Sequence, residues 1–322
     1  MVSSVYTPAV LPALVAHADW SKDPKKRWMA RGVLQPNGRY FAHAPKRVGA
    51  LANLLKRLLA EAGPSASVLV GFDFPIGLPV AYAERAGIER FLNVLLQLGA
   101  GKWEQFYSVC ERPEQISLWR PFYPYRPGHT HRRYLVDELK VSKDDLWRRC
   151  DLRHGGRPAA APLFWTLGPQ QVGKAAIVGW RDVLAPALQD DSLDLAIWPF
   201  SGALFELFRP GRIVVAETYP AEVYRHLGLS FSQSKRVQAA RAAQASVLLR
   251  WADRVGVDLH ADLRAAIEEG FGPHRHGDDL FDATVGLFGM LNVLLLHRSP
   301  GEPDHESVRA IEGWILGQSA TP

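Results

Sequence analysis

Acidic side chains stand where apolar segments of this sequence end, and these are the residues best suited to chemistry. Asp19 stands next to last in the segment LVAHADW, Asp73 follows the apolar run VLVGF, and Glu217 ends IVVAE. A further acidic group lies in GDDLFDA, where Asp279 and Asp282 are three residues apart and would share one face of a helix. Acids that follow the strands of one sheet can meet at its carboxyl edge, where α/β sheets tend to carry their sites.

Carboxylates brought together in this way would need a cation. Like charges repel, and removing them from water is costly, but a bound divalent cation offsets both effects. Ligands that offer only oxygen suit Mg²⁺ or Mn²⁺ rather than zinc. Two such ions about 4 Å apart can activate water and stabilise the leaving oxygen when a phosphodiester is cleaved. Each acid taken alone is explained at least as well by a turn or a helix cap, so the combination carries the prediction.

The elements that would position these acids follow from the hydrophobic pattern. Apolar runs, the hairpin signal Asn37-Gly38 and helical periodicity alternate in a way that predicts a mixed sheet covered by helices. We expect strands at 14–20, 27–34, 39–43, 68–72 and 213–217, and helices at 45–62, 80–100, from 171 onward, 234–254, 259–269 and 277–297.

The segment 101–170 differs from the rest of the chain. It is rich in proline, arginine and aromatic residues, as in WRPFYPYRPGHTHRRY, and it has no clean period, so we expect an insertion made of helix and loop. Arginine interleaved with aromatic residues suits a surface that tracks a nucleic-acid backbone. A lid that packs its aromatic residues inward and leaves its arginines in water explains the pattern equally well. The candidates for nucleic-acid contact are Arg120, Arg126, Arg132, Arg133 and, after the insertion, Lys174, for which a solvated helix position is the simpler explanation.

Several of these segments together resemble a known family. HADW, GFDFPIGLP, GPQQVGKAAIVGW, IWPFSG, AETYPAEVY and DDLFDATVGL are similar, in order, to the family called domain of unknown function 429, predicted nucleases of the ribonuclease H-like fold. One departure is that the first motif reads HADW where a glycine-containing turn is frequent, and a tryptophan after Asp19 would narrow access to a metal.

The resemblance implies a specific architecture and site. It implies an α/β fold with a ribonuclease H-like mixed five-stranded sheet flanked by helices, as a single domain over 13–300 with the insertion 101–170 inside it and a C-terminal tail at 301–322. It also implies a nuclease site that uses Mg²⁺ or Mn²⁺. The implied catalytic residues are Asp19, Asp73, Glu217 and Asp282, and the implied metal ligands are these four together with Asp279.

Composition narrows the class of protein and its partners. The formal net charge of +5 mildly favours an anionic partner, and 47% hydrophobic with 22% charged residues is ordinary for a globular chain. Two cysteines, Cys110 and Cys150, make neither a disulfide framework nor a zinc cluster, so a cytoplasmic setting is expected. The apolar run 291–296 continues a helix that contains Asp282, so we expect no membrane partner.

Three functions remain open at this point. The first is a metal-dependent nuclease that hydrolyses phosphodiester bonds of DNA or RNA. The second is a metal-dependent enzyme that acts on a small phosphorylated metabolite or nucleotide, with the insertion closing over it. The third is a non-catalytic module on the same fold that binds nucleic acid or protein. P-loop, dinucleotide and serine-hydrolase motifs are absent from the sequence, so those enzyme classes lack support.

Overall fold

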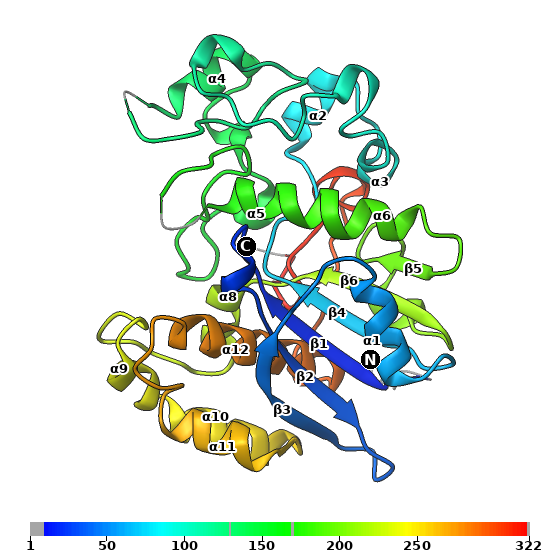
Figure 1. Ribbon diagram of the computed structural model, residues 1–322, viewed down its shortest axis with the longest axis vertical. Helices are drawn as coiled ribbons and strands as arrows, with labels where there is room; N and C mark the ends of the chain where they lie inside the picture. The colour runs from blue at the N-terminus through cyan, green and yellow to red at the C-terminus, as the bar shows by residue number, and fades with distance from the viewer. Residues whose placement is uncertain (1–9, 129, 169–170, 321–322) are drawn as a thin grey trace, which may run out of the picture.

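The protein forms an α/β fold built on one mixed sheet. It is described here by a computed structural model, which covers residues 10–128, 130–168 and 171–320. Seven strands lie in the order β5-β6-β4-β1-β2-β3-β7 (Figure 1). β1, β2 and β3 form an antiparallel meander, β4, β6 and β5 continue the sheet parallel to β1, and β7 pairs parallel with β3. The strands are β1 (Leu14–Asp19), β2 (Trp28–Leu34), β3 (Tyr40–Arg47), β4 (Val68–Phe72), β5 (Asp194–Ile197), β6 (Arg212–Glu217) and β7 (Asp258–Leu259).

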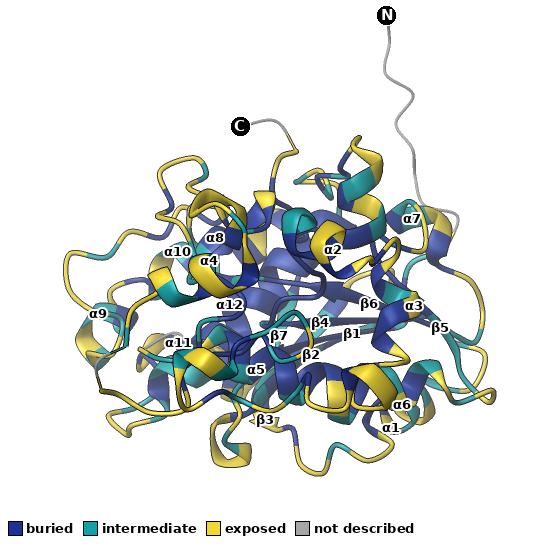
Figure 2. Cartoon of the chain, turned by 90° about the horizontal axis from the view of Figure 1, so that it is seen from above, coloured by how far each residue is buried: buried dark blue, intermediate teal, exposed yellow. Residues whose placement is uncertain are grey.

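Helices cover both faces of this sheet, and the sheet is the most deeply buried layer (Figures 1 and 2). On one side of the sheet lie α1 (Leu54–Ala62), α3 (Phe91–Leu95), α5 (Val172–Gly179) and α6 (Ala185–Leu188), with the π-helical turn η6 (Trp180–Leu184) between the last two. On the same side, α2 (Val80–Ala86) and α4 (Arg133–Leu139) lie farther from the strands, beyond α5 (Figure 1). The other face is covered by α7 (Leu204–Leu207), α8 (Pro220–His226), α9 (Gln238–Ala242), α10 (Ala245–Val255), α11 (Ala261–Glu268) and α12 (Gly277–Leu294).

The central strands are buried on both faces, and this explains their unbroken apolar sequences. All five residues of β4 are buried. Val70 and Phe72 point into the core beneath α1 and α5, whereas Leu69 points into the core beneath α12, as the two-residue period of a strand requires. An acid that follows such a strand therefore marks the point where the chain leaves the core.

The segment 101–168 is part of the first core rather than a separate body. Short 3₁₀ turns and α4 form it, and Phe106, Phe122 and Tyr123 are buried in the same cluster as Phe72 of the sheet. The 3₁₀ turns are η2 (Gly101–Trp103), η3 (Pro113–Gln115), η4 (Asp144–Leu146) and η5 (Arg149–Asp151), and a further turn, η1 (Pro24–Lys26), follows β1. The aromatic residues of the insertion thus pack inward in large part.

The C-terminal segment also differs from the expected tail. The π-helical turn η7 (Val308–Glu312) is followed by Trp314, Ile315 and Leu316, which are all buried, and Ile315 pairs with Glu217 at the end of β6. Residues 301–318 therefore pack against the carboxyl edge of the sheet and close part of it.

Other boundaries differ from the expected ones for local reasons. The sheet has seven strands rather than five, because the short strands β5 and β7 add one edge strand on each side. β3 continues to Arg47, so α1 begins at Leu54 and not at 45. The expected helix 80–100 is two helices, because Gly87 adopts the left-handed conformation (φ 68°) that ends α2. Among the described residues, no helix is both long and apolar enough to span a bilayer.

A close contact between β1 and α12 fixes the height of that helix over the sheet. A Cβ at Gly286 would stand 2.1 Å from a carbon of the His17 ring, so only glycine permits this approach. The ring of His17 is also bonded through Nδ1 to the carbonyl oxygen of Ala283, at 3.0 Å. His17 lies two residues before Asp19 on β1, and Gly286 lies one turn after Asp282 on α12. The contact between His17 and Gly286 therefore helps to place Asp282 beside the end of β1, where Asp19 stands.

Candidate metal centre

Asp19 and Asp73 stand side by side at the carboxyl ends of neighbouring parallel strands. Ala18 and Phe72 are register partners, and the backbone N–H of Asp73 donates to the carbonyl oxygen of Ala18 at 3.1 Å. The chain turns away from the sheet immediately after Asp73, where Pro75 cannot donate to a ladder and Gly77 has φ 136°. The sequence therefore places one carboxylate on each strand end at the edge where sites are expected.

Asp19 is buried and Asp73 is half-buried, and neither carboxylate has a partner among the described residues. Asp19 is only 8% exposed, and within the described residues neither its side chain nor that of Asp73 makes a hydrogen bond or an ion pair. Burial, followed by the negative charges of Asp282, Asp73 and Asp279, raises the pKa of Asp19 well above its ordinary value. Burial and the charge of Asp282 raise the pKa of Asp73 to about 8. A cation at this position would relieve both effects.

Asp282 reaches the same centre from α12, but its charge is already paired. One oxygen accepts a hydrogen bond from the Tyr224 hydroxyl of α8, and the other accepts from the Lys235 ammonium group. Lys235 also donates to the Tyr224 oxygen at 2.9 Å. Burial alone would lower the pKa of Lys235, but Asp282 and Tyr224 raise it well above its ordinary value, so the ammonium group stays charged.

Two further acids stand at the N-terminus of α12, where negative charge is favourable. Asp279 is bonded to the Nδ1 of His276 at 3.0 Å, and Asp278 lies 3.9 Å from Arg236. Burial raises the pKa of Asp279, which also adds to the negative potential at Asp19.

The acids open into a polar cleft with two hollows. The larger, of about 720 Å³, is lined by Asp19, Asp279 and Asp282 together with basic side chains from the loops around them. The smaller, of about 350 Å³, contains Asp73 and the aromatic residue Tyr219. The loop after β1 separates the hollows, because Trp20, Ser21 and Lys26 line both. The basic residues of the larger hollow are Lys26, Lys235, Arg236, His274 and Arg275.

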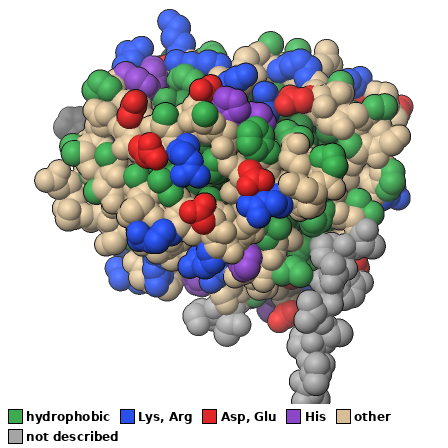
Figure 3. Space-filling view, turned by 90° about the horizontal axis from the view of Figure 1, so that it is seen from below, with side chains coloured by type: hydrophobic (Ala, Val, Ile, Leu, Met, Phe, Trp, Pro, Cys, Tyr) green, Lys and Arg blue, Asp and Glu red, His purple; other side chains and the backbone are tan. Residues whose placement is uncertain are grey.

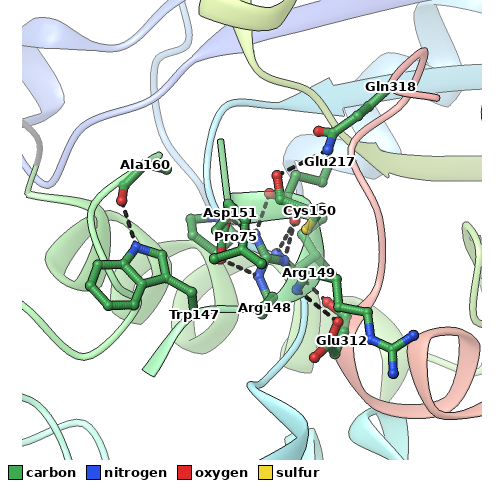
Figure 4. A network of polar contacts seen from close by, with 12 residues as sticks. Pro75, Trp147, Arg148, Arg149, Cys150, Asp151, Ala160, Glu217, Glu312 and Gln318 are labelled. Atoms are coloured by element: carbon green, nitrogen blue, oxygen red, sulfur yellow. Dashed lines mark hydrogen bonds and ion pairs between the residues drawn. The ribbon is translucent and has the colours of Figure 1, made fainter. Parts of the chain in front are cut away.

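Glu217 lies next to this centre, but its side chain points to a different partner. Arg148 donates from Nη1 to Oε2 and from Nη2 to Oε1, each at 2.6 Å, and the backbone N–H of Ile76 donates to Oε2 at 2.6 Å (Figure 4). Arg148 is fully buried and also forms a two-pronged pair with Asp151, at 2.9 and 2.8 Å. Both oxygens of Glu217 are thus engaged by a guanidinium group that comes from the insertion.

A second group of possible ligands surrounds that arginine and does not fit a cation. The ligand atoms of Cys150, Asp151 and Glu217 all lie within 4.8 Å of one another, which holds for no other set of three such residues in the described part of the chain. Arg148 already pairs with both carboxylates there, and burial raises the pKa of the Cys150 thiol well above its ordinary value. The Asp19 and Asp73 pair, which has oxygen donors and no cation, fits a divalent ion better.

The expected nucleic-acid contacts have varied surroundings. Arg120 donates to the backbone oxygens of Ser108 and Val109, so it braces the insertion. Lys174 donates to the backbone carbonyl oxygen of Tyr125 at 3.3 Å. Arg132 lies over the ring of Trp165, Arg133 pairs with Asp137 at 3.1 Å, and Arg126 is exposed. On the face shown in Figure 3, acidic and basic side chains are interspersed.

Sequence reasoning did not find three residues that shape this centre. Lys235 and Tyr224 follow no motif that marks them, and Arg148 was one of many arginines in the insertion. Only the strand-end position of the acids gave a usable signal.

Comparisons with protein-family models, with curated proteins and with solved structures find no match to this chain.

Proposed function

We propose that this protein is a divalent-metal-dependent phosphodiesterase that acts on nucleic acid. The observation that carries the proposal is the pair of carboxylates on adjacent strand ends, the buried Asp19 and the half-buried Asp73. Neither has a partner among the described residues, and both open to a cleft with a basic rim. The strand order β3-β2-β1-β4-β6, with an antiparallel meander followed by parallel strands, supports a ribonuclease H-like fold. It also supports the resemblance to domain of unknown function 429.

The residues of the cleft fit the parts of such a reaction. Asp19 and Asp73 would hold Mg²⁺ or Mn²⁺, which would supply a Lewis acid that lowers the pKa of water and withdraws charge from the phosphate. Lys26, Arg236 and Arg275 line the larger hollow, where they would bind the phosphates on either side of the bond that breaks. Tyr219 lines the smaller hollow and is half-buried, so its ring would pack against a base or sugar there.

The size of the hollows favours a second candidate. Volumes of about 350 and 720 Å³ lie in the range of pockets that bind one small molecule. An enzyme that hydrolyses a free nucleotide or another small phosphorylated metabolite would use the same acids and the same basic rim.

One set of assays separates these candidates. Protein stripped with EDTA is supplied with Mn²⁺ and incubated with end-labelled single- and double-stranded DNA and RNA, and separately with nucleotides. We expect cleavage of a polynucleotide by the wild type and by Lys46→Gln, which changes an exposed lysine of β3, and none by Asp19→Asn. Turnover of nucleotides alone would select the second candidate. Equal cleavage by the wild type and by Asp19→Asn would contradict both.

A further inference from the structure

The five acids at the cleft differ in whether a protein side chain already pairs with them. Asp282 is paired with Lys235, Asp278 faces Arg236, and Asp279 is bonded to His276. Asp19 and Asp73 remain without a partner in the part of the chain that the structure describes. Asp19 and Asp73 are therefore the two carboxylates left to bind a cation, and one divalent ion balances the charge of two ionised carboxylates.

Lys235 occupies the position that a second ion would need. Its ammonium group contacts Asp282, and Asp282 is the acid whose charge acts most strongly on both Asp19 and Asp73. A divalent ion shared by Asp282 and Asp19 would have to displace Lys235 from Asp282 and from the Tyr224 oxygen, and would meet its positive charge at close range. Among the described residues, no three of these carboxylates converge within 4.8 Å of one another, so the cleft has no three-acid site that could hold a further ion beside Lys235.

We propose that Lys235 is a built-in cation that takes the place of a second metal ion, so that the centre binds one divalent ion between Asp19 and Asp73. This inference rests on the proposed function. It assigns Lys235 a positioning role: the ammonium group holds Asp282 away from the bound ion and sets how many ions the site accepts. Tyr224 keeps that ammonium group in place through its oxygen.

The test counts ions and does not need catalysis. Protein freed of metal with EDTA is titrated with MnCl₂ by calorimetry, and free Mn²⁺ is measured by electron paramagnetic resonance. We expect about one Mn²⁺ per chain for the wild type and for Lys46→Gln, about two for Lys235→Gln, and at least a tenfold loss of affinity for Asp19→Asn. Circular dichroism checks that each variant is folded.

Each result bears on a different claim. Two ions in the wild type, or one ion in a folded Lys235→Gln variant, would overturn the role of Lys235 while the proposed metal-dependent function still stands. No Mn²⁺ binding by either protein would overturn both. Should Lys235→Gln fail to fold, Tyr224→Phe takes its place, because it loosens the lysine without removing its charge, and there we expect tighter binding of a second ion than in the wild type.

Discussion

Arg148 and Glu217 form a buried ion pair with two parallel hydrogen bonds, each 2.6 Å long, between the insertion and the end of β6. The geometry is that of a guanidinium fork on a carboxylate, and Arg148 is fully buried. A strand-end acid that looked in the sequence like a metal ligand is thus held by a protein cation, and the following predictions depend on this difference.

Removing the arginine should destabilise the protein strongly. Arg148→Met leaves Glu217 and Asp151 buried without their cation, and breaking such a pair costs about 3–5 kcal/mol. Urea unfolding measures this free energy. Arg133→Met is the matched control, because the exposed pair of Arg133 and Asp137 should contribute less than about 1 kcal/mol. Equal effects of the two substitutions would contradict the assignment.

Glu217 and Asp73 should differ in their effect on metal binding. Glu217→Gln should change the affinity for Mn²⁺ less than about threefold, because both oxygens of Glu217 face Arg148. Asp73→Asn should weaken it more than about tenfold, because its carboxylate is free. Calorimetric titration of the two folded variants makes the comparison. If Glu217→Gln weakens Mn²⁺ binding more than Asp73→Asn does, Glu217 is a metal ligand after all.

The raised pKa of Asp73 makes stability depend on pH when no metal is present. The folded protein keeps a proton on Asp73 up to about pH 8, whereas the unfolded chain releases it near 3.8. Between these values the folded state binds more protons, so the free energy of unfolding in EDTA should fall as pH rises. Asp73→Asn should flatten this part of the curve. Urea titrations at several pH values measure it, and a slope unchanged in the variant would refute the shift.

The same proton should oppose metal binding. A carboxylate must lose its proton to bind Mn²⁺, so the affinity should rise by about tenfold per pH unit as pH approaches about 8, and should level off above that value. Titrations in buffers of different ionisation enthalpy count the protons released. Affinity that does not change from pH 6 to 8 would show that Asp73 is already ionised or is not a ligand.

Gly286 offers a test of how the helix positions Asp282. Gly286→Ala places a methyl group against the His17 ring, which should cost about 1–3 kcal/mol and shift α12. Gly32→Ala is the control, because its Cβ would meet Leu291 at an ordinary 3.5 Å. We expect weaker Mn²⁺ binding only in Gly286→Ala, measured alongside urea unfolding. If both variants keep the Mn²⁺ affinity and the free energy of unfolding of the wild type, the contact between His17 and Gly286 does not set the position of α12.

Local patterns predicted much of the sheet because its central strands are apolar runs with clear ends. β1, β2, β4 and β6 lie close to the expected ranges, and the acids Asp19 and Asp73 stand at the strand ends as expected. β5 was missed because a four-residue strand leaves little signal, and β7 has only two residues. The partner of Glu217 could not be foreseen, since Arg148 is 69 residues away and resembles its exposed neighbours.

The fixing of the insertion by Arg148 bears on how a substrate enters. Moving 101–168 away from the sheet would separate Arg148 from Glu217 and leave buried charges without their partners. The free-energy cost would be a large share of the 5–15 kcal/mol by which a typical domain is stable. We therefore expect the insertion to stay docked on the sheet while substrate enters and leaves. The residues that line the two hollows around the acids come from other parts of the chain, mainly 20–26, 171–175, 235–236 and 273–275, so we expect substrate to reach the acids between these segments.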